Sequence, residues 1–255
     1  MIGKRSLSVK GIGGSAVVSR RRGIGQEERD MEEPNRESSG HYRSQRGKEY
    51  FAWQSQGGLQ RGRINARKFA RFIRPHEAVL DFGCGGGTLL HHLDCARRIG
   101  VEVNPAAREA AQANGIEAHE SLETVPDGSI DAVVSNHSLE HVLSPVHVLS
   151  DLRRKLVAGG RLVLCVPIDD WRTQKRINLS DVNHHLYTWT PLLMGNLLAE
   201  AGYRVERVWV YTHAWPPKNW QKLDAALPAR LFDLICTATA WRYRRRQIMA
   251  VASSP

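Results

Sequence analysis

From Ala78 onward, short apolar runs alternate with segments of helical periodicity, and this alternation limits the fold more than any other feature. Five runs are rich in Val, Ile and Leu, and they cover residues 78–83, 99–103, 116–119, 130–135 and 161–167. Helical patterns lie between them, over about 86–94, 105–114 and 145–157. Strands that alternate with crossover helices form parallel sheets. We therefore predict an α/β fold with a doubly wound sheet and helices on both faces.

The C-terminal part of the chain predicts two further strands. Residues 190–203 have the pattern of a helix that ends at a glycine, and residues 203–211 and 245–253 have the pattern of strands. A long insert at 213–245 separates these strands, which can pair antiparallel at one edge. The prediction is a mostly parallel, seven-stranded sheet with an antiparallel last strand.

The N-terminal segment differs from the rest in composition. Residues 1–45 are rich in Gly, Ser, Arg and Glu without a helical or strand period, so we predict a disordered basic tail. A transit peptide and an upstream extension before Met31 are alternatives that the sequence leaves open. A helical period begins at Tyr50 and stops before Pro75, as expected for a leader helix. Residues 46–255 are expected to form one domain.

The net charge of +10 is concentrated at the ends of the chain. Residues 1–76 carry 17 Lys and Arg against 7 Asp and Glu, whereas residues 77–155 carry 6 against 12. Net charge affects association more than fold, and its position decides which partner it can bind. Because the middle of the chain is acidic, we expect no nucleic-acid substrate.

The sequence does not support a membrane-spanning protein or one stabilised by disulfides or zinc. An apolar run of about 18 residues is needed to span a bilayer, and the longest candidate, near 231–240, is short and contains Asp233. The chain has 4 cysteines and no C-x-x-C pair, which fits neither a disulfide framework nor a zinc site. We expect reduced thiols and a cytoplasmic protein.

A glycine-rich loop follows the first predicted strand. Asp81 precedes Gly83, Gly85 and Gly87, and a helical pattern begins directly afterwards. Glycines permit a tight turn and close approach of a ligand to the backbone. Asp81, which precedes the glycines, would repel a phosphate and would suit a cationic amino-acid group. Glu102, at the end of the second strand, can accept hydrogen bonds from ribose hydroxyls. This order points to S-adenosylmethionine rather than to a dinucleotide.

Four motifs occur in one order: VLDFGCGGG, GVEVNP, VPDGSIDAVVSNHSLEHV and LVAGGRLVLCVP. With them, the chain resembles the class I S-adenosylmethionine-dependent methyltransferases of the small-molecule branch over roughly residues 50–255. The segments YFAWQSQGG, NHHLYTWTPLLMGNLLAEAGY and WPP are similar to those of bacterial methyltransferases associated with glycan modification. The resemblance implies a Rossmann-like methyltransferase fold and S-adenosyl-L-methionine as cofactor.

The resemblance also implies roles for individual residues. Those expected to bind the cofactor are Asp81, Gly83, Cys84, Gly85, Gly87, Glu102, Val103, Glu120, Ser121, Leu122, Asn136 and His137. Within this set, Glu102 would hold the ribose and Glu120, Ser121 and Leu122 would surround the adenine. The segment around Glu120 departs from the family pattern, in which an Asp is more usual.

Histidines gather around the expected catalytic face. Methyl transfer to a hydroxyl needs a base, and a neutral imidazole can accept a hydroxyl proton at physiological pH. The candidates are His137, His141, His184 and His185, and we favour His141 or His185, with His137 as the third catalytic candidate. The alternative for each is a loop-anchoring hydrogen bond to the backbone.

The spacing His137-x-x-Glu140-His141, with His185 in a later loop, also resembles the magnesium site of small-RNA 2′-O-methyltransferases. In that motif a glutamate stands where this chain has His137. Because Mg²⁺ prefers oxygen ligands, the substitution weakens the analogy. We expect a loop without a metal, in which Glu140 and His141 orient one another.

The segments after the fourth predicted strand give the expectations for the acceptor side. The sequence Ser135-Asn136-His137-Ser138 lacks the Pro-Pro-aromatic signature of base-amine methyltransferases. Of 18 aromatic residues, 11 lie in 171–243, and the segments 168–190 and 213–245 are expected to form an acceptor lid. Residues 228–246 form an amphipathic helix candidate with a basic end, which would contact a membrane at its inner face or cover the acceptor pocket.

Together these features predict an S-adenosylmethionine-dependent methyltransferase that O-methylates a sugar hydroxyl of a glycan or glycan precursor. One alternative acceptor is a quinone, a lipid-like compound or another small metabolite. Another alternative is an RNA-associated or non-catalytic cofactor-binding module. The acceptor's identity and the oligomeric state do not follow from the sequence.

Overall fold

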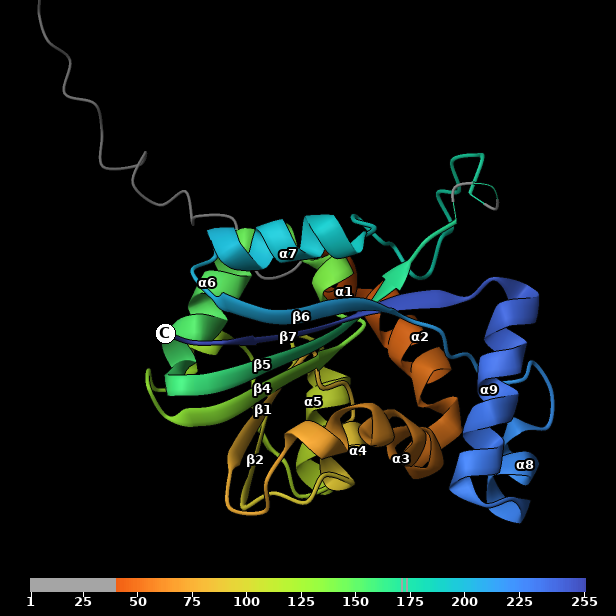
Figure 1. The fold of residues 1–255 in the computed structure, drawn as a ribbon, viewed down its shortest axis with the longest axis horizontal. Coiled ribbons are helices and arrows are strands. Elements are labelled where there is room, and N and C mark those ends of the chain that lie inside the picture. The colour runs from red at the N-terminus through yellow and green to blue at the C-terminus, as the bar shows by residue number, and fades with distance from the viewer. Residues whose placement is uncertain (1–39, 171, 173) are drawn as a thin grey trace, which may run out of the picture. The chain divides into compact units, whose positions relative to one another are not determined.

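The structure is a computed structural model that describes residues 40–170, 172 and 174–255. A seven-stranded sheet with the order β3-β2-β1-β4-β5-β7-β6 organises these residues (Figure 1). The strands are β1 (Ala78–Phe82), β2 (Arg97–Val101), β3 (Glu117–His119), β4 (Ile130–Asn136), β5 (Leu156–Ile168), β6 (Arg204–Tyr211) and β7 (Arg246–Ser253). The predicted number of strands is confirmed.

The strand directions also follow the prediction. β1 pairs parallel with both β2 and β4, and β7 pairs antiparallel with both β5 and β6. The chain order reverses between β1 and β4, because β2 and β3 continue on one side and β5 on the other. In open α/β sheets such a reversal opens a crevice at the carboxyl ends of the strands, where ligands bind.

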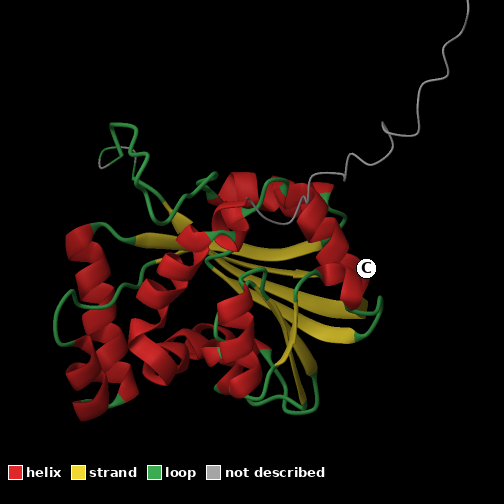
Figure 2. Ribbon diagram, turned by 180° about the vertical axis from the view of Figure 1, so that it is seen from behind, coloured by secondary structure: helices red, strands yellow, loops and turns green. Residues whose placement is uncertain are grey.

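Helices cover both faces of the sheet (Figure 2). They are α3 (Gly58–Phe69), α4 (Thr88–His91) and α5 (Pro105–Ala113) on one face, and α6 (Pro145–Lys155) and α7 (Pro191–Glu200) on the other. Successive residues of β1 enter different cores: Val79 packs with α3 and α4, while Leu80 packs with α6 and α7. A strand buried on both faces explains the continuous apolar runs in the sequence.

The N-terminal boundary of the domain lies earlier than predicted. Gly40–Arg43 forms the helix α1 and Gln45–Gln54 forms α2, so the expected tail over 1–45 is wrong for its last residues. Tyr42 is buried there by distant parts of the chain, and a single aromatic residue produces no sequence period. The rest of the expected tail, residues 1–39, lies outside the described residues.

The predicted leader helix is divided. α2 ends at Gln54, and α3 begins at Gly58, whose φ of 48° is in the left-handed region that glycine tolerates. α3 ends at Phe69, and a short 3-10 turn precedes Pro75. The break directs α2 toward the carboxyl ends of the strands, where its side chains line the cavities described below.

The insert at 213–245 folds as a helical pair against α3. It contains α8 (Trp220–Ala226) and α9 (Ala229–Tyr243). Arg63 and Arg67 of α3 form ion pairs with the buried carboxylate of Asp224, and the Arg67 Nη2 to Asp224 Oδ1 distance is 2.9 Å. Among the described residues, no helix has the length and apolar character that crossing a bilayer requires. All four cysteines are buried free thiols.

Candidate active site

The glycine loop after β1 requires glycine at three positions. Gly83, Gly85 and Gly87 have φ values of 75°, 53° and 71°, in the left-handed region that residues with a Cβ disfavour. A Cβ added at Gly83 would lie 2.1 Å from Ser138 Oγ, and one at Gly87 would lie 2.5 Å from Ile116 Cγ1. The loop therefore depends on glycine for both its conformation and its close contacts.

Glu102, immediately after β2, holds this loop to the neighbouring strand end. Its Oε2 accepts a hydrogen bond of 2.9 Å from the Gly85 N–H, and its Oε1 accepts one of 2.8 Å from the Asn104 N–H. Burial raises the pKa of the Glu102 carboxyl, and these backbone bonds offset part of the increase. An ionised carboxylate has about four acceptor positions, so both oxygens can accept further hydrogen bonds from a ligand.

Asp81 lies in β1 beside the loop and is only 2% exposed. Its Oδ1 has no hydrogen-bond partner among the described residues. Burial, together with the nearby Glu102 carboxylate, raises the pKa of Asp81 well above the usual value for an aspartate. A buried carboxylate without a hydrogen-bond partner is costly, and a cationic ligand group would compensate it. The ammonium group of S-adenosylmethionine fits this position.

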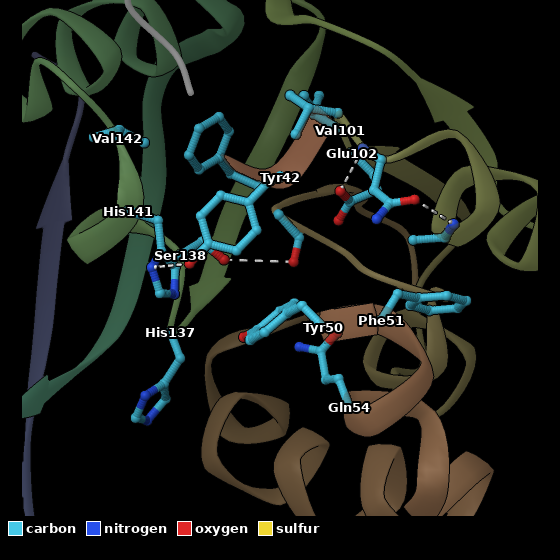
Figure 3. A pocket seen from close by; sticks show the side chains of 15 residues that line it. Tyr42, Tyr50, Phe51, Gln54, Val101, Glu102, His137, Ser138, His141 and Val142 are labelled. Carbon is cyan, nitrogen blue, oxygen red and sulfur yellow. Dashed lines mark hydrogen bonds between the residues drawn. The ribbon is translucent and has the colours of Figure 1, made fainter. Parts of the chain in front are cut away.

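Two open cavities meet at the glycine loop, with volumes of about 80 and 330 Å³. Both are lined by Phe51 and Gln54 of α2 and by Gly83. Figure 3 shows the smaller cavity, with Phe51 and Gln54 labelled. Of the residues predicted to bind the cofactor, the larger cavity is lined by Asp81, Gly83, Cys84, Gly85 and Asn136, and the smaller by Gly83, Glu102, Val103 and His137. Gly87, Glu120, Ser121 and Leu122 line neither cavity.

The structure brings in four further residues from the N-terminal helices: Tyr42, Tyr50, Phe51 and Gln54 line the smaller cavity. Sequence reasoning did not assign them to the site. The segment YFAWQSQGG contains three of them, but its similarity to other methyltransferases implied no role for any single residue. Tyr42 lay in the expected tail and had no sequence signal of its own.

Glu120, expected beside the adenine, forms ion pairs instead of lining a cavity. Its carboxylate lies 3.3 Å from Arg43 Nη1 and 3.5 Å from Arg108 Nη2, and its side chain is 54% exposed. Leu122 is buried in the core. Adenine contacts from this segment stay a prediction.

His137 follows β4 with a φ of 58°, which is uncommon for a residue other than glycine. Its backbone N–H donates to the Cys165 carbonyl at 2.8 Å, and its Nε2 lies 3.0 Å from Gln247 Oε1. Burial acts to lower the pKa of His137, but the Cys165 side chain and the Glu140 carboxylate outweigh it and raise the pKa to about 10. A protonated imidazole is poorly suited to accept a proton, so His137 is the weakest of the three catalytic candidates.

His141 and His185 lie side by side, with ring centroids 4.9 Å apart. His141 lies in the 3-10 turn Leu139–His141 after β4, and its Nδ1 is 2.7 Å from the Tyr42 hydroxyl. His185 comes from the loop before α7, and its Nδ1 is 2.8 Å from Asp169 Oδ2. Each ring is therefore oriented through Nδ1 by a partner outside the pair.

The two imidazoles differ in their electrostatic surroundings. Burial, aided by the nearby His185, lowers the pKa of His141 to about 4, although the Glu140 carboxylate acts in the opposite direction. Burial also acts to lower the pKa of His185, but the hydrogen bond to Asp169 and the Glu140 charge raise it overall.

Glu140, in the same 3-10 turn as His141, is 0% exposed. Neither of its carboxylate oxygens has a hydrogen-bond partner among the described residues. Its Oε1 lies 3.8 Å from His141 Nε2 and 3.5 Å from His137 Nδ1. The carboxylate therefore faces both imidazoles without a hydrogen bond to either.

Two hydrogen bonds hold the loop before α7 next to Glu140 and His141. The Leu186 N–H donates to the Glu140 carbonyl at 2.8 Å, and the Tyr42 hydroxyl donates to the Asn183 carbonyl. These bonds place the loop beside the histidine pair, and a lid role for it stays a prediction. The other expected part, 213–245, contributes no residue to either cavity and packs on α3.

The mostly parallel sheet with its strand-order reversal, the glycine loop and the acids at the ends of two adjacent strands define a class I S-adenosylmethionine-dependent methyltransferase. When bound, this cofactor supplies a methyl group activated by its sulfonium. A family described as Methyltransferase domain matches residues 58–208. The chain belongs to this methyltransferase domain family.

Parts of the chain are similar to curated proteins. An L11 ribosomal protein methyltransferase from Cupriavidus taiwanensis is 32% identical over 155 residues, which is 57% of this chain and 46% of that protein. An uncharacterized 37.1 kDa protein in transposon TN4556 of Streptomyces fradiae is 39% identical over 111 residues, covering 38% of this chain and 32% of the relative. The chain thus spans less than half the length of these relatives.

Two crystal structures share the fold. A SAM-dependent methyltransferase from Thermotoga maritima has a TM-score of 0.59 and 17% identity, covering 85% of this chain and 100% of its own. Another, from Archaeoglobus fulgidus, has a TM-score of 0.55 and 18% identity, covering 80% of this chain and 99% of its own.

Proposed function

We propose that the chain is an O-methyltransferase that methylates a sugar hydroxyl of a glycan or glycan precursor. The observation that carries this proposal is the group of His141, His185 and Glu140 at the edge of the cavity lined by the glycine loop. Methyl transfer to a hydroxyl forms an O–CH₃ bond, breaks the S–CH₃ bond and releases the hydroxyl proton. The acceptor site must therefore polarise the hydroxyl or accept its proton, and imidazole and carboxylate groups can do either.

The cofactor side of the proposal rests on charge and on hydrogen-bonding capacity. Asp81 would bind the cofactor's ammonium group, since its carboxylate oxygen is buried and unpartnered among the described residues. Glu102 would accept hydrogen bonds from the ribose with the positions that its two backbone bonds leave open. Positioning alone supplies much of the catalysis, because the leaving group is already activated.

Aromatic side chains support a sugar as the acceptor. Tyr42, Tyr50 and Phe51 line the smaller cavity, and Tyr187 is partly exposed on the loop beside it. Aromatic faces pack well against the apolar faces of sugar rings and of other flat acceptors. A quinone, a lipid-like compound or another metabolite would use the same surface, so product analysis must separate these acceptors.

The test is mass spectrometry of products after incubation with the cofactor and a panel of acceptors. The panel contains nucleotide sugars, cell-surface glycan extracts, quinones and fatty acids, with ribosomal protein L11 as a protein acceptor. We expect a mass increase of one methylene on a sugar, absent with the D81A variant. A product on L11 or on a quinone alone would overturn the sugar proposal, and cofactor binding without any product would indicate a binding module.

We further propose that α9 contacts an anionic membrane surface where a lipid-linked glycan would be found. Its side chains Phe232 and Cys236 pack on α3. Residues 228–246 also present exposed apolar and basic side chains, namely Leu231, Leu234, Trp241, Arg242, Tyr243, Arg244, Arg245 and Arg246. Basic and aromatic residues together favour binding at an anionic bilayer interface.

Co-sedimentation with liposomes tests this contact. We expect the full chain to bind vesicles that contain phosphatidylserine and not vesicles of phosphatidylcholine alone. Changing the four arginines between positions 242 and 246 to alanine should remove the difference. Equal binding by that variant would exclude this surface.

A further inference from the structure

We propose that Glu140, His141 and His185 form a binding site for a divalent transition-metal ion at the edge of the cofactor cavity. The ion's role in holding the acceptor hydroxyl rests on the proposed function, whereas the site itself rests on the geometry of the three side chains. The proposal replaces the expectation of a loop without a metal and the direct base role predicted for the two histidines.

The three ligand groups converge from separate parts of the fold. Glu140 and His141 come from the turn after β4, and His185 comes from the loop that precedes α7. One ligand atom from each residue lies within 4.8 Å of the others. Tetrahedral metal bonds of about 2.0 to 2.2 Å place ligand atoms about 3.3 to 3.6 Å apart, so side-chain movements of about 1 Å would complete the site.

Both histidines have Nδ1 engaged by a partner outside the site. The Tyr42 hydroxyl donates to the Asn183 carbonyl and therefore accepts from His141 Nδ1–H, which leaves the lone pair on His141 Nε2. Asp169 accepts from His185 Nδ1–H in the same way, at 2.8 Å. Metal-binding histidines are commonly oriented by such a carboxylate or hydrogen-bond partner on the other ring nitrogen.

Glu140 provides an independent observation. It is fully buried, and neither carboxylate oxygen has a hydrogen-bond partner among the described residues. His137 Nδ1 lies 3.5 Å and His141 Nε2 lies 3.8 Å from Glu140 Oε1. A buried carboxylate without hydrogen bonds is expensive unless a cation compensates it. The ion pair with His137 at 3.5 Å balances part of this charge, and an ion held by Glu140, His141 and His185 would engage the carboxylate positions that have no hydrogen bond.

The donor set indicates which ions fit. Two imidazole nitrogens and one carboxylate suit Zn²⁺, Co²⁺, Mn²⁺ or Fe²⁺, whereas Mg²⁺ and Ca²⁺ prefer oxygen ligands. Three protein ligands leave coordination positions open. His141 also lines the smaller cavity, so an open position would face the space available to an acceptor.

An acceptor hydroxyl in such a position would become more acidic, because a bound cation stabilises the deprotonated oxygen. The O–H bond then breaks with the proton passing to water, and the O–CH₃ bond forms as the S–CH₃ bond breaks. No oxidant or reductant is needed. His137 is not one of the three ligands and would keep its bond from Nε2 to Gln247.

Metal titration of the full-length protein, stripped with EDTA and dialysed, tests the site. We expect calorimetry to show one equivalent of Zn²⁺ bound, and the Co²⁺ form to show the visible absorption of a nitrogen-ligated ion. The variants E140Q and H185A should each weaken Zn²⁺ binding at least tenfold. D169N, which acts through His185, should weaken it about 10- to 100-fold. The matched control is H147A, because His147 is exposed on α6.

E140Q preserves the size of the buried side chain and H185A changes a partly exposed one, so folding of at least one variant is expected. Absence of stoichiometric binding, or wild-type affinity in both variants, would overturn the metal site. Hydroxyl methylation at full rate by the metal-free protein would overturn the ion's role and leave the proposed function standing. Tight metal binding without methylation of any hydroxyl acceptor would overturn the proposed function and leave the metal site standing.

Discussion

The two sides of the active site are built in different ways. On the cofactor side, Asp81, Glu102 and the glycine loop lie at the ends of two adjacent parallel strands, β1 and β2, and Glu102 is fixed by two backbone N–H groups. On the acceptor side, His141 and His185 come from a turn and a long loop. The cofactor side follows from the sheet, whereas the acceptor side depends on contacts between segments that are distant in sequence.

The largest expected effect comes from D81N, which changes the cofactor side alone. In D81N the side chain keeps its size and loses the charge that would pair with the cofactor's ammonium group. Removing one partner of a buried charge pair costs about 3 kcal/mol, so calorimetry should show about 100-fold weaker cofactor binding. E109Q, which removes an exposed acid on α5, is the charge-matched control. Retained affinity in D81N would refute the assignment of this acid.

The complementary variant is H185A, which should affect the acceptor side alone. His185 lines neither cavity, so the cofactor dissociation constant should stay within about twofold of the wild type. The turnover number for hydroxyl methylation should fall by up to about 100-fold, because one member of the group proposed to polarise the hydroxyl is lost. Steady-state kinetics and calorimetry on the same preparation separate the two effects. A parallel loss of cofactor affinity would mean that the two sides are not independent.

A pair of glycine variants sharpens the claim that the loop is shaped by close packing. Gly87 and Gly115 have similar φ values, 71° and 77°, but only at Gly87 would a Cβ meet another atom, Ile116 Cγ1 at 2.5 Å. G115A should lower the free energy of unfolding by about 1 kcal/mol, through backbone strain alone. G87A adds a steric clash and should lower it by about 2 to 3 kcal/mol. Urea denaturation measures both, and equal losses would contradict the packing argument.

The difference between the two sides also explains what the sequence could predict. Strand alternation places Asp81 and Glu102 at neighbouring strand ends, and the order of the strands follows from connection rules. Both acids line the cavities. Local patterns were less accurate for boundaries: the helix expected over 86–94 covers only Thr88–His91.

Contacts between distant segments were not predictable. Tyr42 reaches His141 from a segment expected to be disordered, and no period marks a single anchoring aromatic residue. Glu120 has the sequence position of an adenine contact, but Arg43 from that same segment pairs with it. The histidine motif was visible in the sequence, whereas the tautomers that favour metal binding depend on Tyr42 and Asp169, which the sequence did not connect to it.

The smallest expected effect is a pH dependence of cofactor binding. Burial, with the Glu102 charge beside it, raises the pKa of Asp81 well above its usual value in the cofactor-free protein. The pKa of Glu102 is also raised by burial. A cationic ligand stabilises the ionised acids, so below these raised pKa values binding releases protons and affinity increases with pH, by up to about tenfold per unit for one acid. Above the raised values affinity should become constant.

The same shift reduces the stability of the cofactor-free protein as pH rises. Between the ordinary and the raised pKa the folded chain holds a proton that the unfolded chain releases, so unfolding becomes easier with increasing pH in that window. Bound cofactor should remove much of this loss, because its charge restores the ionised form. Calorimetry in two buffers of different ionisation enthalpy measures the released protons directly. D81N should show fewer released protons and a flatter pH profile, and an unchanged profile would assign the proton release to Glu102 alone.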